Sequence, residues 1–274
     1  MQPLSTIETL RQSIAALENR PVLDPPKEDP QGDAPPRGAD LLAAPAGLLH
    51  DLYASHPRES GLLLGAALGL ARPLLSGGRP AILWLQPVAD GQELGLPYGP
   101  GLDRFGIPAK QVVFARLGSI PDLLWAMEEA LGCSAIAAVI ADMSTLPKAF
   151  DFTASRRLGM RAQAGGSSAF VLRYGAERVM SAAHLRWAVS PAPSAADPFD
   201  ARAPGRPRLV FELERSRLAR NAIRPEGARL VVDWTEHGFL PAQNRFPAAQ
   251  RPARRPPPSG AVPPPLGHGL SQAG

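Results

Sequence analysis

Between residues 47 and 173 the chain alternates short apolar segments with segments of helical period. Apolar runs of this kind are typical of strands buried on both faces, and the segments between them are typical of the helices that cover those faces. The alternation therefore predicts an α/β fold with a mainly parallel sheet. After Gly175 the apolar segments follow one another without helices. These later segments are expected to extend the sheet as antiparallel strands at its edge.

The expected elements can be placed by residue number. The strands are predicted at 48–53, 81–86, 111–115, 137–141 and 169–173, and then at 184–189, 209–214 and 229–234. The helices are predicted at 59–75, 120–131 and 154–164. In the second helix the apolar residues share one face, and Gly132 stops it.

The chain of 274 residues is 45% hydrophobic, enough for one core of ordinary size with length left for its ends. Residues 1–20 predict a short amphipathic helix, because Ser5 and Glu8 have capping-box spacing before an apolar stripe. That helix packs either on the core or on another chain. Residues 21–44 read as a linker rich in Pro and Asp, residues 45–240 as the core domain, and residues 241–274 as a disordered, basic, Pro-rich tail.

The positive charge is unevenly distributed. The net charge is +4, and the tail alone carries four arginines with no acid. Within the core, residues 151–220 hold twelve arginines and six acids. That half of the fold either faces an anionic partner or is simply well solvated.

Cys133 is the only cysteine, which excludes an internal disulfide and a multi-thiolate metal site and fits a reducing cytoplasm. The five histidines have no metal-ligand spacing, and no cofactor is expected. The apolar stretch 61–75 is interrupted by Arg72 and Pro73, so no membrane role is indicated. Trp84, in the middle of a strand, and Cys133 are both predicted to lie in the core.

The strand, loop and helix at 48–75 are where a nucleotide-hydrolysing α/β domain would carry G-x-x-x-x-G-K-[ST]. The loop instead reads ASHPRESG from 54 to 61, with no lysine. Pro57 removes one backbone donor and Glu59 adds a negative charge, both of which disfavour phosphate. The chain is therefore predicted not to be a working ATPase, with Arg58 as a vestigial stand-in for the lysine.

The strand 137–141 ends in Asp142, as does the magnesium-binding strand of such enzymes. Alternatively, Asp142 caps a turn with Ser144 and Thr145. If the phosphate loop is inactive, Asp142 is a remnant. Arg58 and Asp142 are the two candidates for a vestigial nucleotide site.

The order of elements resembles the RecA core, and several strings resemble the inducible mutagenesis protein A family, ImuA. The resemblance covers residues 45–240 and is carried by GLLHDLYA (47–54), AILWLQ (81–86), LPYGPGLDRFGI (96–107), DLLWAMEEAL (122–131), SRRLGMRAQAGGSSAFVLR (155–173), SAAHLRWAVSPAPS (181–194), LVFELERSRLA (209–219) and LVVDWTEHGF (230–239).

This resemblance implies a RecA-like three-layer sandwich and a role in the bacterial DNA-damage (SOS) response. The protein would be a non-catalytic accessory factor of error-prone translesion synthesis. The implied partners are ImuB, which is a polymerase-like protein of the Y family, and an error-prone relative of the polymerase III α subunit, with RecA as a further candidate. The family is not defined by a catalytic residue, so no active site is implied.

Two surfaces could carry such a function. Five arginines are candidates for weak contact with single-stranded DNA: Arg156, Arg157, Arg161, Arg173 and Arg186. An ordinary solvated face, paired with acids such as Asp151 and Glu177, is favoured over DNA contact because no aromatic residues interleave with the arginines.

Trp125 lies off the apolar face of its helix and is either a partner anchor or a flank residue packed on a loop. Two other functions remain open. One is a SulA-like inhibitor of cell division, against which the length of the chain argues. The other is a RecA-like DNA-dependent ATPase.

Overall fold

The computed structural model describes Leu42 and residues 44–242, except 105, 145–146, 176, 196, 198–199, 201–202, 219–224 and 236. The helix expected at 1–20, most of the linker at 21–44 and most of the tail at 241–274 lie outside the described residues. No helix in the described part has the length and apolar character that crossing a membrane requires.

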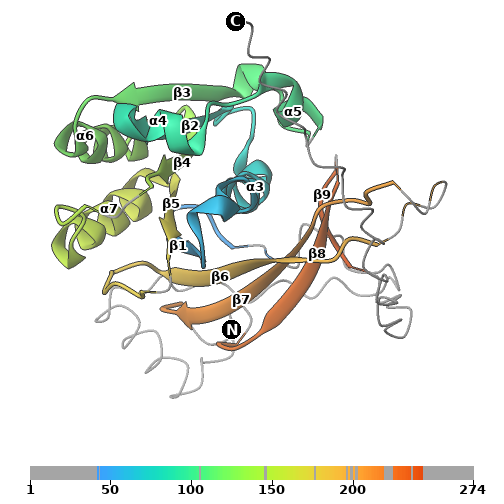
Figure 1. Ribbon diagram of the computed structural model, residues 1–274. Coiled ribbons are helices and arrows are strands. Elements are labelled where there is room, and N and C mark those ends of the chain that lie inside the picture. The colour runs from blue at the N-terminus through green and yellow to red at the C-terminus, as the bar shows by residue number, and fades with distance from the viewer. Residues whose placement is uncertain are drawn as a thin grey trace, which may run out of the picture. The chain divides into compact units, whose positions relative to one another are not determined.

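The described chain forms one mixed sheet of nine strands in the order β3-β2-β4-β5-β1-β6-β7-β8-β9 (Figure 1). The strands are β1 Leu49–Ala54, β2 Ala81–Pro87, β3 Val112–Leu117, β4 Ile136–Asp142, β5 Ser168–Tyr174, β6 Leu185–Ala192, β7 Arg208–Ser216, β8 Arg229–Thr235 and β9 Gly238–Pro241. The α-helices are α3 Ser60–Ala71, α4 Gly91–Leu94, α5 Gly99–Arg104, α6 Ile120–Leu131 and α7 Phe152–Gly165. Short 3-10 turns are η1 Pro57–Glu59, η2 Arg72–Leu74, η3 Val88–Asp90 and η4 Ala109–Gln111.

The predicted α/β class is confirmed, with one error of direction. Strand β6 was expected to be antiparallel, but it pairs in parallel with β1, and only β7, β8 and β9 run antiparallel to their neighbours. The chain passes from β5 to β6, on the other side of β1, through residues 175–184, and the described residues of this segment form no helix. His184 then fixes the entry to β6, since its backbone N–H donates to Leu49 O and its Nδ1 accepts from Leu49 N. Strand β9, only four residues long, was not predicted.

Helices cover both faces of the parallel part of the sheet, giving three layers (Figure 1). Helix α3 lies on one face, and α6 and α7 lie on the other. Local sequence sets the ends of the last two helices. Ser119 accepts from the Asp122 amide at the start of α6, and Asp151 accepts from the Ala154 amide at the start of α7. Gly166, with φ of 73°, ends α7 in the left-handed conformation.

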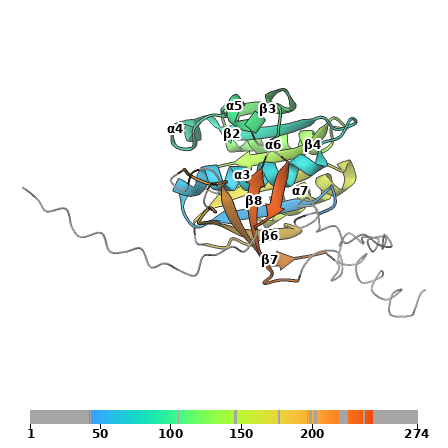
Figure 2. The ribbon, with the colours of Figure 1, turned by 90° about the vertical axis from the view of Figure 1, so that its right-hand side faces the viewer.

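Helix α3 is apolar nearly all round and is covered on more than one side. The antiparallel end of the sheet curls so that β8 and β9 lie against the helix opposite the parallel strands (Figures 1 and 2). Glycines permit this approach. A Cβ on Gly69 would lie 2.2 Å from the ring of Phe239, and one on Gly65 would lie 3.3 Å from Trp234. The curl therefore encloses one of the two hydrophobic cores.

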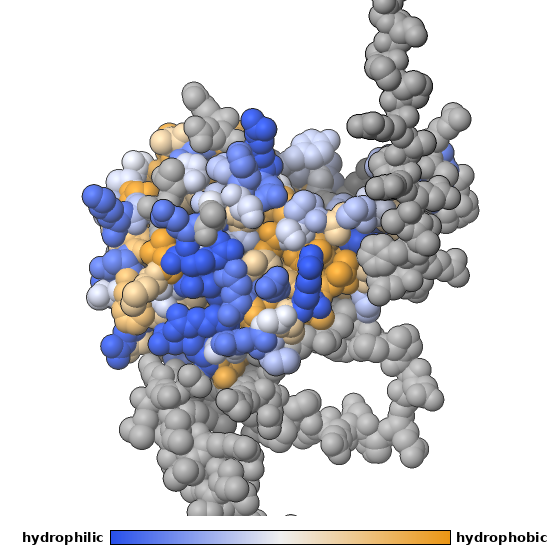
Figure 3. Space-filling model, turned by 60° about the horizontal axis from the view of Figure 1, so that its bottom comes forward, coloured by the Kyte–Doolittle hydropathy of each residue, from blue (hydrophilic) through white to orange (hydrophobic). Residues whose placement is uncertain are grey.

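The outer side of the antiparallel strands is polar. Seen from the bottom of Figure 1, where β6, β7 and β8 lie, the surface carries a continuous band of hydrophilic side chains (Figure 3). Two ion pairs involve these strands. Arg208 Nε of β7 lies 2.6 Å from Asp233 Oδ1 of β8, and Arg178 Nη2, in the segment before β6, lies 2.8 Å from Glu214 Oε1 of β7. This part of the sheet therefore has a solvated face, as antiparallel strands commonly do.

Candidate functional site

The loop after β1 is held by hydrogen bonds among its own residues. The His56 N–H donates to Glu59 Oε2 at 3.0 Å, and the Arg58 N–H donates to His56 Nδ1 at 3.3 Å. The Glu59 N–H donates to the His56 carbonyl, also at 3.0 Å. Pro57, the first residue of the short turn η1, has no N–H to offer. Amides that a phosphate would need are therefore satisfied within the loop, and a carboxylate already accepts from one of them.

The two residues predicted as remnants of a nucleotide site have very different surroundings. Arg58 is exposed in the loop. Asp142 is buried at the end of β4, where the Tyr174 hydroxyl donates to its Oδ1 at 2.8 Å. Burial raises the pKa of Asp142 to about 6, although hydrogen bonds from Tyr174 and neighbouring side chains oppose the rise.

The alternative role for Asp142, capping a turn with Ser144, is wrong. Ser144 instead bonds to Asp90, which accepts from its amide at 2.7 Å and from its hydroxyl at 2.8 Å. Thr145 lies outside the described residues. Asp142 is thus tied to β5 through Tyr174, and Ser144 is tied to Asp90.

Arg173 and Arg186 do not belong to a basic surface, and that part of the DNA-contact prediction is wrong. Both face the buried Asp51 of β1: Arg173 Nε lies 2.8 Å from Oδ1, and Arg186 Nη2 lies 3.5 Å from Oδ2. Ser181 Oγ donates to the same carboxylate. Arg173 is only 4% exposed. The two arginines flank one aspartate because β5 and β6 pair on either side of β1.

The ring of Tyr53 lies among three guanidinium groups. The guanidinium carbons of Arg173, Arg178 and Arg186 lie 5.7, 4.3 and 5.3 Å from the ring centroid. These are cation–π distances, and they place positive charge at the carboxyl end of β1. The sequence showed the separate arginines but not this cluster, since the cluster depends on strand order.

A cavity of about 700 Å³ lies beside this cluster. It is formed where β1 and β5 end and by the segments that follow β4 and β5, a place where open α/β sheets commonly bind ligands. Its lining residues are Tyr53, Ser144, Pro147, Lys148, Phe150, Asp151, Phe152, Arg173, Tyr174, Glu177, Val179 and Met180. Sequence reasoning missed this cavity. It is the largest of the cavities described here and the strongest candidate for a ligand site.

The three arginines of α7 do lie at the surface. Arg156, Arg157 and Arg161 are all exposed, so the structure brings them together on one helix. Arg157 Nε lies 2.5 Å from Glu128 Oε1 of α6. Glu128 is therefore the acid that pairs with Arg157, whereas Asp151 caps the N-terminus of α7.

Trp125 of α6 projects into solvent. It is 66% exposed, an unusual exposure for so large an apolar side chain. This exposure contradicts the alternative in which Trp125 packs as a flank residue against a loop. Trp84 is 3% exposed and lies in the core as predicted, whereas Cys133, just after the end of α6, is exposed and its core prediction is wrong.

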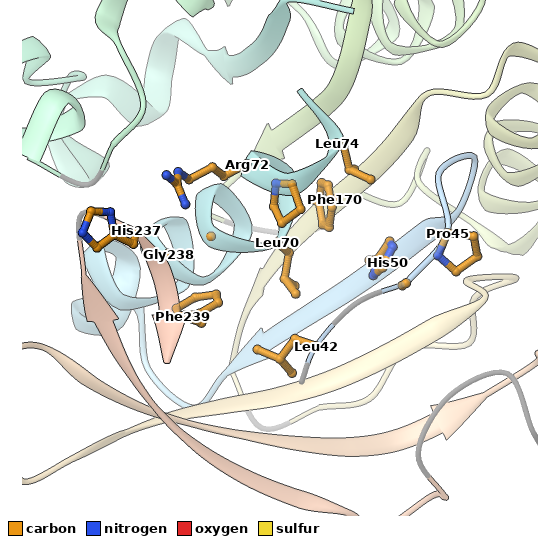
Figure 4. A pocket seen from close by; sticks show the side chains of 13 residues that line it. Leu42, Pro45, His50, Leu70, Arg72, Leu74, Phe170, His237, Gly238 and Phe239 are labelled. Atoms are coloured by element: carbon orange, nitrogen blue, oxygen red, sulfur yellow. The ribbon is translucent and has the colours of Figure 1, made fainter. Parts of the chain in front are cut away.

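A second, smaller cavity of about 120 Å³ lies on the α3 face of the sheet (Figure 4). His50 of β1 lines it, with its ring centroid 4.5 Å from that of Phe170. Burial lowers the pKa of His50 to about 3, so this imidazole is neutral at physiological pH. Leu42, Leu70 and Phe239 supply apolar walls. Among the described residues, no cluster of His, Cys, Asp and Glu could hold a metal ion.

No protein-family profile and no curated protein matches the chain. Among solved structures, the RadB recombinase superposes with a TM-score of 0.51, covering 75% of this chain and 96% of that one, at 15% sequence identity. The fold is RecA-like. The predicted three-layer architecture is thereby confirmed, and at this identity the likeness extends to the fold alone.

In this RecA-like frame the strand before the loop and the helix after it are both present. What differs is the loop between them, whose amides bond to its own residues. The RecA-like architecture is thus combined with a loop whose amides already bond within the loop.

Proposed function

We propose that this protein is a non-catalytic RecA-like accessory factor of the bacterial DNA-damage (SOS) response. In this proposal it assembles an error-prone translesion-synthesis complex by holding partners together. The observation that carries the proposal is the hydrogen bond from the His56 amide to the Glu59 carboxylate, which occupies the loop of an otherwise intact RecA-like core. A fold that is retained without the phosphate loop favours a binding role over nucleotide hydrolysis.

The environment of Asp142 supports the absence of catalysis. A magnesium-binding acid needs to be open to the metal. Asp142 is 2% exposed, and its Oδ1 accepts a hydrogen bond from Tyr174. These properties disfavour the alternative of a DNA-dependent ATPase.

The proposed partners are those that the resemblance to the ImuA family implies. They are the Y-family polymerase-like protein ImuB and the error-prone relative of the polymerase III α subunit, with RecA as a further candidate. Trp125 is the proposed anchor, because an exposed tryptophan on a rigid helix gives a partner a large apolar contact. The exposed arginines of α7 supply a proposed weak contact with single-stranded DNA.

Affinity capture from cells with damaged DNA tests the proposal. A tagged form of this chain is expected to recover the Y-family polymerase-like protein together with the α-subunit relative. Recovery of the tubulin-like division protein without any polymerase component would contradict the proposal and favour the cell-division inhibitor instead.

A further inference from the structure

Arg173 has unused hydrogen-bonding capacity in a buried place. Its Nε donates to Asp51, but neither Nη1 nor Nη2 has a hydrogen-bond partner among the described residues. The side chain is 3% exposed. A buried guanidinium nitrogen without a partner is costly, so this arrangement is unusual unless something else supplies acceptors.

The same side chain lines the 700 Å³ cavity. Tyr53 lines it too, and its hydroxyl is likewise buried without a partner among the described residues. The remaining walls are largely apolar. Phe150 lies under the guanidinium, 4.9 Å from ring centroid to guanidinium carbon, and Val179 and Met180 lie farther out. The cavity thus combines a few unsatisfied donors with an apolar wall, as ligand sites commonly do.

We propose that this cavity binds a carboxylate carried on an apolar or aromatic body. The two terminal nitrogens of Arg173 match the two oxygens of a carboxylate in a bidentate pair. The Tyr53 hydroxyl, which lines the same cavity and lacks a partner among the described residues, supplies a third donor in this proposal, and the apolar walls receive the body of the ligand. Asp51 is a positioning residue, because its bond to Nε holds the guanidinium plane in place.

The positive charge is concentrated at one point of the cavity. Asp51 carries one negative charge, and Arg173 and Arg186 carry two positive charges beside it, so one positive charge is in excess at that point. Asp151, Glu177 and Lys148 also line the cavity, and with them the named charges balance. Repeated phosphates of a nucleic acid would bring several negative charges close to Asp151 and Glu177, which disfavours them relative to one carboxylate bound at Arg173.

Two sources share this chemistry: the terminal carboxylate of a partner chain that ends in an apolar residue, and a small free aromatic acid. The inference goes beyond the proposed function and does not depend on it. It is tested by the binding of defined probes to the purified chain.

The test is calorimetric titration with matched probes. N-acetyl-Leu-Phe with a free carboxylate is expected to bind at least about tenfold more tightly than the same dipeptide with a terminal amide, since charge-assisted hydrogen bonds are lost. Tighter binding of the dipeptide than of 3-phenylpropanoate identifies a chain terminus as the source, and the reverse order identifies a small acid. Equal binding of acid and amide, no binding of either acid, or displacement of the acid by oligothymidine would overturn the proposal.

Two variants localise the binding without disturbing the Arg173–Asp51 pair. Tyr53→Phe keeps the ring and is expected to weaken acid binding by about tenfold, while Tyr98→Phe, on an exposed tyrosine away from the cavity, leaves it unchanged. Met180→Glu places a like charge in the lining at a side chain that is 75% exposed and is expected to weaken the same binding. Met160→Glu, outside the lining, is its control. Unchanged affinity in both cavity variants would refute the site.

Discussion

The backbone N–H of His56 donates to the carboxylate of Glu59 at 3.0 Å, while the imidazole of His56 accepts from the Arg58 amide. Together these bonds form a capping box at the loop where a related fold would hold phosphate. The side chain of Glu59 thus satisfies an amide that a nucleotide would otherwise need.

This relationship gives a prediction about stability. Glu59→Ala removes the carboxylate and is expected to lower the free energy of unfolding by about 1 kcal/mol, because the His56 amide loses its partner. Arg58→Ala, at an exposed neighbour, should change it by less than about 0.5 kcal/mol. Urea unfolding measures both. Equal effects in the two variants would show that the capping box contributes nothing.

Stability should also depend on pH below neutrality. Burial lowers the pKa of His50 to about 3 and that of His184 to about 4, so both contribute stability above their unfolded pKa of 6.5 that is lost as the pH falls. Asp142 acts in the opposite sense. Its pKa is raised to about 6, so its contribution is present at low pH and is lost as the pH rises from about 4 through 6.

Between pH 6 and pH 4 the two histidines therefore outweigh Asp142. The free energy of unfolding is expected to fall by about 1.4 kcal/mol for each unit of decrease in pH. Asp142→Asn removes the opposing group and should steepen the slope to about 2.8 kcal/mol per unit. Urea unfolding at pH 6 and pH 5 measures the slopes. A variant slope no steeper than that of the unmodified chain would contradict the raised pKa of Asp142.

The contact between α3 and β9 can be tested with two glycines of one helix. Gly69→Ala places a Cβ 2.2 Å from the ring of Phe239 and should destabilise the fold by about 1–3 kcal/mol. Gly61→Ala has nothing within 4 Å of the new Cβ and should be neutral or stabilise by up to about 1 kcal/mol through helix propensity. Thermal unfolding compares them. Similar midpoints for both variants would show that β9 does not pack on α3 as described.

Trp125 offers a direct test of the partner surface. Trp125→Ala is expected to leave the thermal midpoint unchanged, because the side chain is 66% exposed, and to reduce capture of the Y-family partner by tenfold or more, on the order of a hot-spot loss. Tyr98→Ala removes another exposed aromatic and should leave capture intact. Capture at full strength by Trp125→Ala would remove this residue from the interface.

The α7 arginines are tested by salt dependence. Replacing Arg156, Arg157 and Arg161 with alanine should weaken binding of oligothymidine at low salt, and the unmodified chain should lose affinity as salt rises. A control that replaces the exposed Arg58, Arg206 and Arg229 should have a smaller effect. Fluorescence anisotropy measures both. Affinity that is insensitive to salt, or equal in the two triple variants, would exclude a DNA contact on α7.

Sequence patterns located the elements well because burial on both faces leaves continuous apolar runs. Helix α6 begins and ends at the predicted residues 120 and 131, where Ser119 and Gly132 mark its ends. The direction of a strand was harder to predict. The pattern of β6 does not distinguish parallel from antiparallel pairing, which is decided by the passage from β5 to β6 on the other side of β1.

The candidate site was harder to predict than the fold. Arg173 and Arg186 were expected on a surface, because the sequence does not reveal that their strands flank Asp51. The loop was predicted more accurately, since the absence of a lysine and the presence of Pro57 and Glu59 can be read directly from the sequence. Its self-bonded geometry appears only in three dimensions.

The central claim is that the protein binds partners without using nucleotide. Purified chain and the purified Y-family polymerase-like protein can be run together by size exclusion with and without ATP, while phosphate release is followed in the presence of single-stranded DNA. The account predicts co-elution that is the same in both conditions and no phosphate release above background. Co-elution only with ATP, or DNA-stimulated release that Asp142→Asn abolishes, would contradict it.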